Sequence, residues 1–180
     1  WSLPADAPTR LGRLRRRLLR LEESSRFEQA YSDFAERLHA RPGWRTDRSA
    51  DVMAWRFSRP GRAYRVFRLL DLRGRLRGIA VTTLRDGRVL FVELQVSDEA
   101  SSDLLDLVGS VQETLRGASA TSLVIRSPQE GLVARRLRDE LGFRTESSDT
   151  VLLVRPFAPG FDLLAAGRVF DYRFLDHDVF

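Results

Sequence analysis

A tight turn between two strongly apolar runs constrains this chain more than any other feature. Asp86-Gly87 separates residues 76–84, rich in β-branched side chains, from residues 88–96, apolar at nearly every position. An Asp-Gly pair between such runs is the strongest short-range signal of a β-hairpin. A third run, 64–70, precedes a turn at Arg73-Gly74. The pattern predicts three consecutive strands in an antiparallel meander, the last of them buried on both faces.

The residues after the meander alternate between helical and strand patterns. Apolar residues at helical spacing predict a helix over 103–115, capped by Ser101 or Ser102. A short buried strand is predicted over 121–126, then a helix over 129–141 that ends at Gly142. Two last strands are predicted at 143–146 and 150–155.

The residues before the meander divide less clearly. Residues 1–8 read as an extended arm, and residues 10–23 hold either a helix or a short strand at 17–21. Ser24 or Ser25 followed by Glu28 resembles a capping box, and it predicts a helix that ends near Arg41. A second short helix is predicted over 49–57. We therefore expect an arm (1–15), one domain (16–156) and an aromatic and acidic tail (157–180) that packs on the domain.

The composition excludes several kinds of chemistry. The chain has no cysteine, which removes disulfides, thiol catalysis and thiolate metal sites. All 30 basic residues are arginine, so no lysine can form a Schiff base or bind phosphate in a P-loop. The only histidines are His39 and His177, and Asp176 with Asp178 would make a poor ligand pair, so we expect no metal. The first residue is Trp1 rather than Met, and we expect a processed chain or a domain of a longer one.

The charge is distributed unevenly along the chain. The formal net charge of +5 combines +11 in residues 1–90 with −6 in residues 91–180. Halves of opposite charge can attract each other, which argues against nucleic acid as a partner. No run approaches the ~18 apolar residues of a membrane-spanning helix, so we expect no membrane partner and a cytoplasmic protein.

The predicted order of elements resembles the GNAT superfamily of acyl-CoA-dependent N-acyltransferases. Phe91-Val-Glu-Leu-Gln-Val96 resembles the family's fourth strand, and Glu140-Leu-Gly-Phe-Arg144 resembles the Gly-Phe that follows its last helix, within which Ala134 takes the place of a small residue. The segment from Phe27 through Trp55-Arg56-Phe57 resembles GNAT-like domains of bacterial polysaccharide and cell-envelope clusters. Over residues 16–156 the resemblance implies an α/β fold. Its twisted mixed sheet would have six to seven strands, splayed beside the fourth, with helices on both faces.

Two positions depart from the family's pattern. Active members carry small residues in a loop whose backbone amides bind the CoA pyrophosphate, and here the matching positions are Ala100, Asp103 and Leu105. Asp103 adds negative charge where the diphosphate would lie, so we expect weak CoA binding. Arg138 occupies the position of a tyrosine that protonates the departing thiolate. Arginine cannot act as a general acid near neutral pH, although its fixed charge could stabilise a thiolate.

The candidate site residues follow from this resemblance. Glu93 would be the general base, and the alternative is an ion pair with one of the arginines. Backbone groups of Leu94, Gln95 and Val96 would hold the pantetheine of the donor as an added strand. The remaining candidates for CoA binding are Ser101, Ser102, Arg135, Arg136 and Arg138; helix capping or a solvated helix face is the alternative for the serines and for Arg135 and Arg136.

These expectations lead to two principal functions. The first is transfer of an acyl group, with acetyl-CoA as donor, to an amine of a small molecule or amino sugar. The second is a degenerate GNAT-like domain that acts as a binding or structural module. A different donor, such as an aminoacyl-tRNA, is a third alternative, and a homodimer stays open. Trp44 and Trp55 are predicted to lie in the core or in the wall of a substrate cleft.

Overall fold

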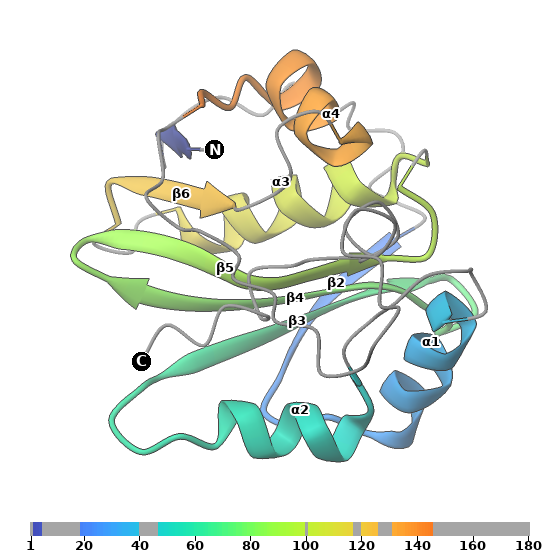
Figure 1. Ribbon diagram of the computed structural model, residues 1–180. Helices are drawn as coiled ribbons and strands as arrows, with labels where there is room; N and C mark the ends of the chain where they lie inside the picture. The colour runs from blue at the N-terminus through green and yellow to red at the C-terminus, as the bar shows by residue number, and fades with distance from the viewer. Residues whose placement is uncertain are drawn as a thin grey trace, which may run out of the picture.

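The described part of the chain is an α/β sandwich around one sheet (Figure 1). A computed structural model describes residues 2–4, 19–39, 47–99, 101–116, 120–125 and 131–145. The strands are β1 (Ser2–Pro4), β2 (Leu19–Ser24), β3 (Tyr64–Asp71), β4 (Leu76–Arg85), β5 (Arg88–Val96) and β6 (Ser122–Ile125). The helices are α1 (Gln29–His39), α2 (Ala50–Phe57), α3 (Asp103–Leu115) and α4 (Leu132–Leu141).

The sheet has the strand order β1-β6-β5-β4-β3-β2. Strands β2 to β5 pair antiparallel with their neighbours, β5 and β6 pair parallel, and β1 pairs antiparallel with β6. Asp86 and Gly87 both have positive φ, 51° and 71°, as a two-residue hairpin turn of type I′ requires. The predicted meander is confirmed, as is a mixed sheet, which has six strands in the described residues against the six to seven predicted.

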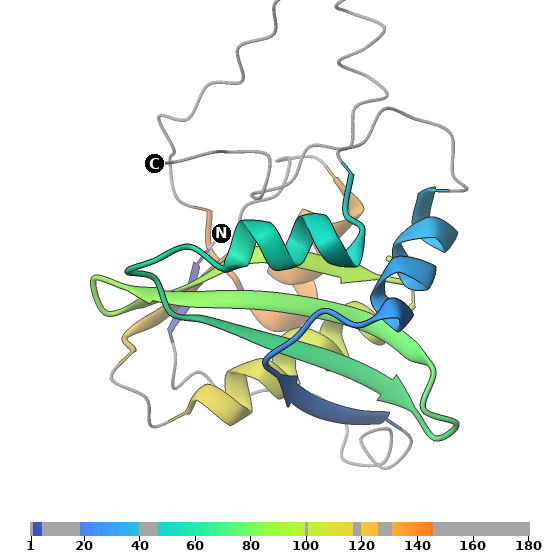
Figure 2. The ribbon, with the colours of Figure 1, turned by 90° about the horizontal axis from the view of Figure 1, so that it is seen from below.

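Helices cover both faces of the sheet. Figure 2 shows the molecule from the side of α1 and α2, with α2 running roughly along the strands. The larger core lies between the sheet and helices α3 and α4, and it includes Phe67, Phe91, Leu107, Leu137 and Phe143. The smaller core lies between the sheet and helices α1 and α2, and it includes Tyr31, Phe34, Met53, Ile79 and Val81. Alternate apolar residues of β3 to β5 serve these two cores, which explains why β5 is apolar along its length.

A glycine lets α3 pack closely on the sheet. A Cβ built at Gly78 of β4 would lie 3.0 Å from the Gln95 carbonyl oxygen and 3.0 Å from a methyl carbon of Leu107. The Leu107 side chain is fully buried against the sheet. Residue 78 therefore has to be small for α3 to reach its position beside the end of β5.

Each of two strands carries one extra residue. Val81 pairs with Glu93 and Thr82 with Phe91, so Val92 of β5 is a β-bulge. Leu69 pairs with Gly78 and Leu70 with Leu76, so Arg77 of β4 is a second one. A bulge changes which face the following side chains point to.

Several predicted boundaries differ from the structure. Residues 19–24 form a strand, so the ambiguity between helix and strand in that segment is resolved. The predicted capping box is wrong, because the Ser24 hydroxyl donates to the Arg26 carbonyl oxygen at 2.9 Å and α1 begins only at Gln29. Helix α4 begins at Leu132 rather than at 129, and it ends at Gly142 with φ of 77°, as predicted.

The arm is described only in part, and the tail is outside the described residues. Ser2–Pro4 of the predicted arm form a strand on β6. The described residues 143–145 add no strand to the sheet. The predicted strand over 150–155, the tail, Trp44, Asp176, His177 and Asp178 lie outside the described residues.

Candidate functional site

The part of β5 after Phe91 has only one partner strand in the described sheet. Pairing between β5 and β6 ends at Phe91 and Ile125, whereas pairing between β5 and β4 continues to Val96 and Gly78. Residues 92–96 therefore have one edge without a partner among the described strands, and this edge is called the free edge below. An extended chain with amide groups can add to such an edge through backbone hydrogen bonds.

The bulge at Val92 determines where Glu93 points. Phe91 and Leu94 both belong to the core under α3 and α4, although an unbroken strand would put residues 91 and 93 on the same face. The extra residue turns Glu93 instead toward α1 and α2, beside its pairing partner Val81 of the smaller core. The carboxylate of Glu93 thus comes to lie next to the free edge but on the opposite face from α3.

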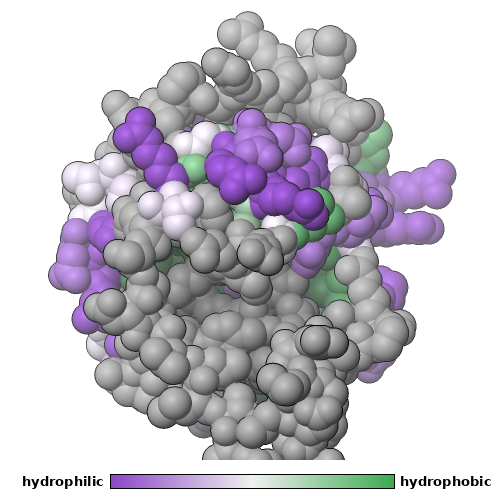
Figure 3. Space-filling view, turned by 45° about the horizontal axis from the view of Figure 1, so that its top comes forward, coloured by the Kyte–Doolittle hydropathy of each residue, from purple (hydrophilic) through white to green (hydrophobic). Residues whose placement is uncertain are grey.

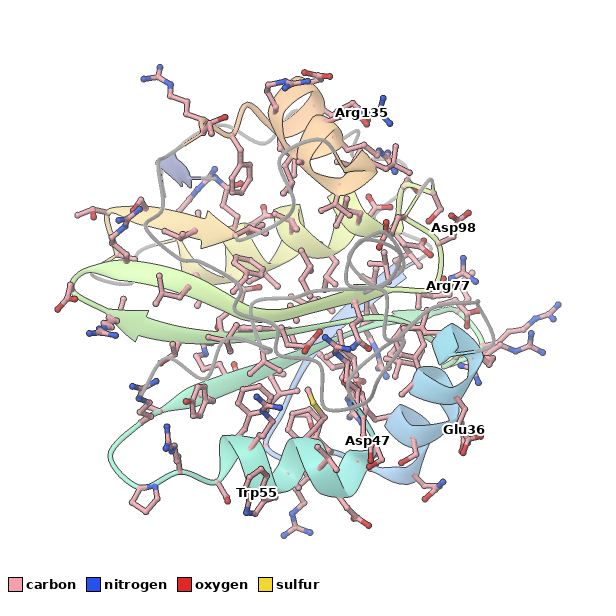
Figure 4. The ribbon with its side chains drawn as sticks, in the orientation of Figure 1. Glu36, Asp47, Trp55, Arg77, Asp98 and Arg135 are labelled. Atoms are coloured by element: carbon pink, nitrogen blue, oxygen red, sulfur yellow. The ribbon has the colours of Figure 1, made fainter. Side chains whose placement is uncertain are left out.

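Glu93 forms a buried ion pair with Arg48. Arg48 Nε donates to Glu93 Oε2 at 3.3 Å, and the two side chains are 3% and 0% exposed. Arg48 is held at the start of α2, where the backbone N–H of Ser49 donates to Asp47 Oδ1 at 2.8 Å and that of Ala50 donates to Ser32 Oγ at 3.0 Å. Figure 4 shows Asp47 between α1 and α2. The alternative predicted for Glu93, an ion pair with an arginine, is therefore present, and it leaves the catalytic role of Glu93 a proposal.

Two further polar side chains lie on the same face. The Tyr31 hydroxyl is buried, and burial first, then the negative charge of Glu93, raise the pKa of this phenol well above its ordinary value. Tyr31 therefore stays protonated near neutral pH and can donate a hydrogen bond. Gln95 is also buried, and among the described residues neither the Tyr31 hydroxyl nor Gln95 Oε1 has a hydrogen-bond partner. The four side chains of Tyr31, Arg48, Glu93 and Gln95 are called the polar cluster below.

An acidic residue occupies the N-terminus of α3. Asp103 Oδ2 accepts hydrogen bonds from Arg77 Nε at 3.1 Å and from Ser97 Oγ at 2.9 Å, and Arg77 Nη2 lies 2.9 Å away. The backbone N–H of Asp103 donates to Ser101 Oγ at 3.2 Å. The N-cap residue of α3 is Ser102, one of the two predicted, but its side chain makes no capping bond. The Ser101 hydroxyl, which was expected to bind a pyrophosphate, accepts from the Asp103 N–H and donates to the Asp98 carbonyl oxygen at 2.6 Å instead.

The three candidate arginines of α4 are placed differently. Arg136 donates from Nη1 to the carbonyl oxygens of Glu99, at 2.9 Å, and Ser101, and its Nε donates to Glu140 at 2.6 Å. Arg138 is 49% exposed and pairs with Asp139 at 2.7 Å. Arg135 is exposed on the outer side of α4 (Figure 4), and Figure 3 shows a hydrophilic patch on the face of the molecule where α4 lies. The structure thus brings only Arg136 to the loop that joins β5 to α3.

Two hollows lie near these elements. One of about 440 Å³ lies between the β3–β4 turn and the first turn of α3, and its charged lining residues are Asp71, Arg73, Arg75, Arg77, Asp103 and Asp106. The other, of about 130 Å³, lies between α1 and strands β2 to β4, with Tyr31 and Arg68 among its lining residues. Three guanidinium and three carboxylate groups line the first hollow, so its charges balance and do not favour binding of an anion.

Sequence reasoning missed three residues of this region and misplaced one. Arg48, Tyr31 and Arg77 meet their partners only in the folded chain, and no local motif marks them. Trp55 is 75% exposed and points outward from α2, so the core alternative predicted for it is wrong, while a place in the wall of a substrate cleft stays a prediction (Figure 4). Helix α2 turns Met53 inward instead, and Met53 is fully buried.

Two further classes of site were sought in the described residues. No three side chains of histidine, cysteine, aspartate and glutamate come together there as metal ligands would. None of the described helices combines the length and the apolar character needed to cross a bilayer.

Comparison with known proteins identifies the fold. No protein-family model matches the chain, and no curated protein matches its sequence. A ribosomal-protein-alanine N-acetyltransferase from Brucella melitensis aligns with a TM-score of 0.53 at 16% identity, over 76% of this chain and 99% of its own. A protein from Pyrococcus furiosus assigned as an acetyl transferase aligns with a TM-score of 0.55 at 13% identity, over 77% of this chain and 99% of its own.

A third solved structure is much longer than this chain. A conserved protein from Enterococcus faecalis, assigned as a probable N-acyltransferase, aligns with a TM-score of 0.52 at 11% identity over 71% of this chain. The aligned part spans only 32% of that protein. These similarities show that the chain has the GNAT-like fold that its sequence predicts.

Proposed function

We propose that the chain is an N-acyltransferase that moves an acyl group, acetyl in the simplest form, from a thioester to an amine. The observation that supports this most is the combination of a free edge on β5, at residues 92–96, with a bulge that turns Glu93 away from the main core. The edge provides backbone groups for an amide-containing donor arm, and Glu93 provides a carboxylate beside it. Both features occur in one strand, so donor and base would be held by the same rigid element.

The proposed reaction uses Glu93 as the proton acceptor. The amine nitrogen attacks the thioester carbonyl carbon, the C–N bond forms and the C–S bond breaks. Glu93 accepts the proton that the amine loses, directly or through water, and the departing thiolate takes a proton from solvent. Arg48 favours the ionised form of Glu93 before reaction, because an adjacent positive charge stabilises a carboxylate.

The acceptor would approach Glu93 from the side of the polar cluster. Tyr31 can donate and Gln95 Oε1 can accept a hydrogen bond there, and both are buried. This pair suits an acceptor that carries hydroxyl or amide groups beside its amine, as an amino sugar does. We therefore propose a small-molecule amine or amino sugar as acceptor.

Acetyl transfer to a panel of amines and amino sugars tests the proposal. Because the chain contains no cysteine, release of thiol from a millimolar acetyl thioester can be followed with a thiol-reactive dye without background from the protein. Glu93→Gln should lower kcat by about 10²- to 10⁴-fold, the usual contribution of a general base. Glu36→Gln, an exposed carboxylate on α1, is the matched control and should leave kcat unchanged. Equal turnover in the Glu93→Gln and wild-type proteins would remove Glu93 from the mechanism.

A binding or structural module is the second candidate function. It is favoured by the burial of the Arg48–Glu93 pair, since a completely buried pair can serve the fold alone. Absence of transfer to every amine in the panel by the folded wild-type protein would favour the module. Transfer that depends on Glu93 would exclude it.

A further inference from the structure

We propose that this protein recognises its acyl donor through the pantetheine arm alone and makes no site for the adenosine diphosphate part of CoA. This inference rests on the proposed function. It assigns the donor to the acyl-pantetheine thioesters that lack the diphosphate, supplied either as a small molecule or on the phosphopantetheine group of a carrier protein.

Charge is the first reason. A diphosphate at the N-terminus of α3 would approach the buried carboxylate of Asp103, with Asp106 buried in the same helical turn and Asp98 and Glu99 in the preceding loop. The guanidinium groups of Arg77, which pairs with Asp103 at 2.9 Å, and of Arg136, which contacts the Glu99 carbonyl oxygen, offset part of this negative charge. Figure 4 shows Arg77 and Asp98 at the same end of the sheet. Like charges at close range repel, and the partly buried ones are screened little by salt.

The hydrogen-bond donors of the loop are the second reason. The backbone N–H of Asp103, the first residue of α3, donates to Ser101 Oγ at 3.2 Å. This amide is one of those that an anion at a helix N-terminus would use, and it already has a partner within the chain. A diphosphate would have to displace that partner.

Arg136 is the third reason. Its guanidinium joins α4 to the same loop through the carbonyl oxygens of Glu99 and Ser101. Those oxygens are acceptors and would repel a phosphate, and the contact ties the loop in its present shape. The Asp103 carboxylate is fixed in the same way. The bulge at Arg77 places the Arg77 guanidinium on the α3 side, where it donates to Asp103, and Ser97 Oγ donates a further hydrogen bond. The negative charge, the engaged Asp103 amide and the Arg136 contact all disfavour a bound diphosphate. None of these groups lies in residues 92–96, so they leave the proposed edge for the pantetheine arm unaffected.

Donor competition tests the inference. We would measure kcat/KM with acetyl-pantetheine, acetyl-4′-phosphopantetheine, an acetylated carrier protein and acetyl-CoA, using one acceptor amine. Acetyl-CoA should be no more than about 3-fold better than acetyl-pantetheine, whereas a diphosphate held by two or three charge-assisted hydrogen bonds would make it better by more than about 10²-fold. If kcat/KM for the acetylated carrier protein exceeds that for both pantetheine donors by at least 10-fold (about 1.4 kcal/mol), the donor is a carrier protein. Equal values of kcat/KM identify the small-molecule thioester as the donor.

A charge-neutral variant supplies a second readout that does not depend on turnover. Asp103→Asn should tighten CoA in calorimetry by about 5-fold or more and leave pantetheine unchanged, because only the diphosphate meets residue 103. Asp33→Asn, an exposed carboxylate on α1, removes the same charge elsewhere and should change neither affinity. Strong preference of the wild-type protein for acetyl-CoA, or an unchanged CoA affinity in Asp103→Asn, overturns the inference while leaving acyl transfer intact. Absence of transfer from all four donors overturns the proposed function itself.

Discussion

The Arg48–Glu93 pair makes a quantitative prediction about folding. Both side chains are buried, and their 3.3 Å contact joins the start of α2 to the centre of the sheet. Removing one member leaves the other charge in a site shielded from water. We expect Arg48→Met and Glu93→Gln each to lower the free energy of unfolding by about 3 to 5 kcal/mol, the usual cost of breaking a buried pair.

A double variant tests whether Arg48 and Glu93 stabilise the fold as a pair or independently of each other. Arg48→Met combined with Glu93→Gln removes both charges, so no charge is left without its partner. Its loss should be close to that of one single variant, which corresponds to a coupling energy of about 3 kcal/mol between the two positions. Urea denaturation followed by circular dichroism measures all of these changes, and Asp33→Asn serves as an exposed control.

One result would refute this reasoning. If the losses of the single variants add in the double variant to within about 0.5 kcal/mol, the two residues act independently. The buried contact would then contribute to the fold through packing and other partners, and the charge balance proposed for Glu93 would have no thermodynamic support.

The remaining predictions concern backbone, packing and titration. Gly142→Ala should lower stability by about 1 to 2 kcal/mol, because φ of 77° is strained for a residue with a Cβ; an unchanged melting temperature would contradict this. Gly78→Ala should cost about 1 to 3 kcal/mol in urea denaturation, because its Cβ would meet atoms 3.0 Å away. Arg65 donates two hydrogen bonds of 2.7 Å to Glu23 and lowers the pKa of this carboxyl, so the pair adds stability above the unfolded-state pKa that is lost as pH falls through the lower folded-state pKa. The exposed pair is worth no more than about 1 kcal/mol, and the difference between wild type and Glu23→Gln should vanish in acid; a difference that persists at low pH would contradict the assignment. Ultraviolet titration should show Tyr31 ionising only when the protein unfolds in alkali, since burial raises its pKa, so Tyr31→Phe should leave the absorbance change before unfolding unaltered; a smaller change in that variant would contradict this.

Much of the fold could be predicted because its signals are local. The Asp86-Gly87 turn requires positive φ at two successive residues, and few other dipeptides accept that. Gly142 marks the end of α4 for a similar reason. The apolar positions of α3 and of β3 to β5 repeat with the periods of a helix and a strand, which place them in the two cores. Boundaries that depend on side-chain competition were predicted less well: Ser24 closes a turn instead of capping α1.

The amino-acid sequence by itself thus determined the order of the central elements and the strand that carries Glu93. Only the tertiary structure decided what Glu93 can do. The bulge at Val92 arises from the register between β4 and β5, and it turns the carboxylate toward Arg48, 45 residues earlier in the chain. Likewise, Asp103 meets Arg77, 26 residues away, because a second bulge places that guanidinium beside α3. Register and bulges are set by the packing of whole strands and helices against one another, so no short stretch of sequence records them.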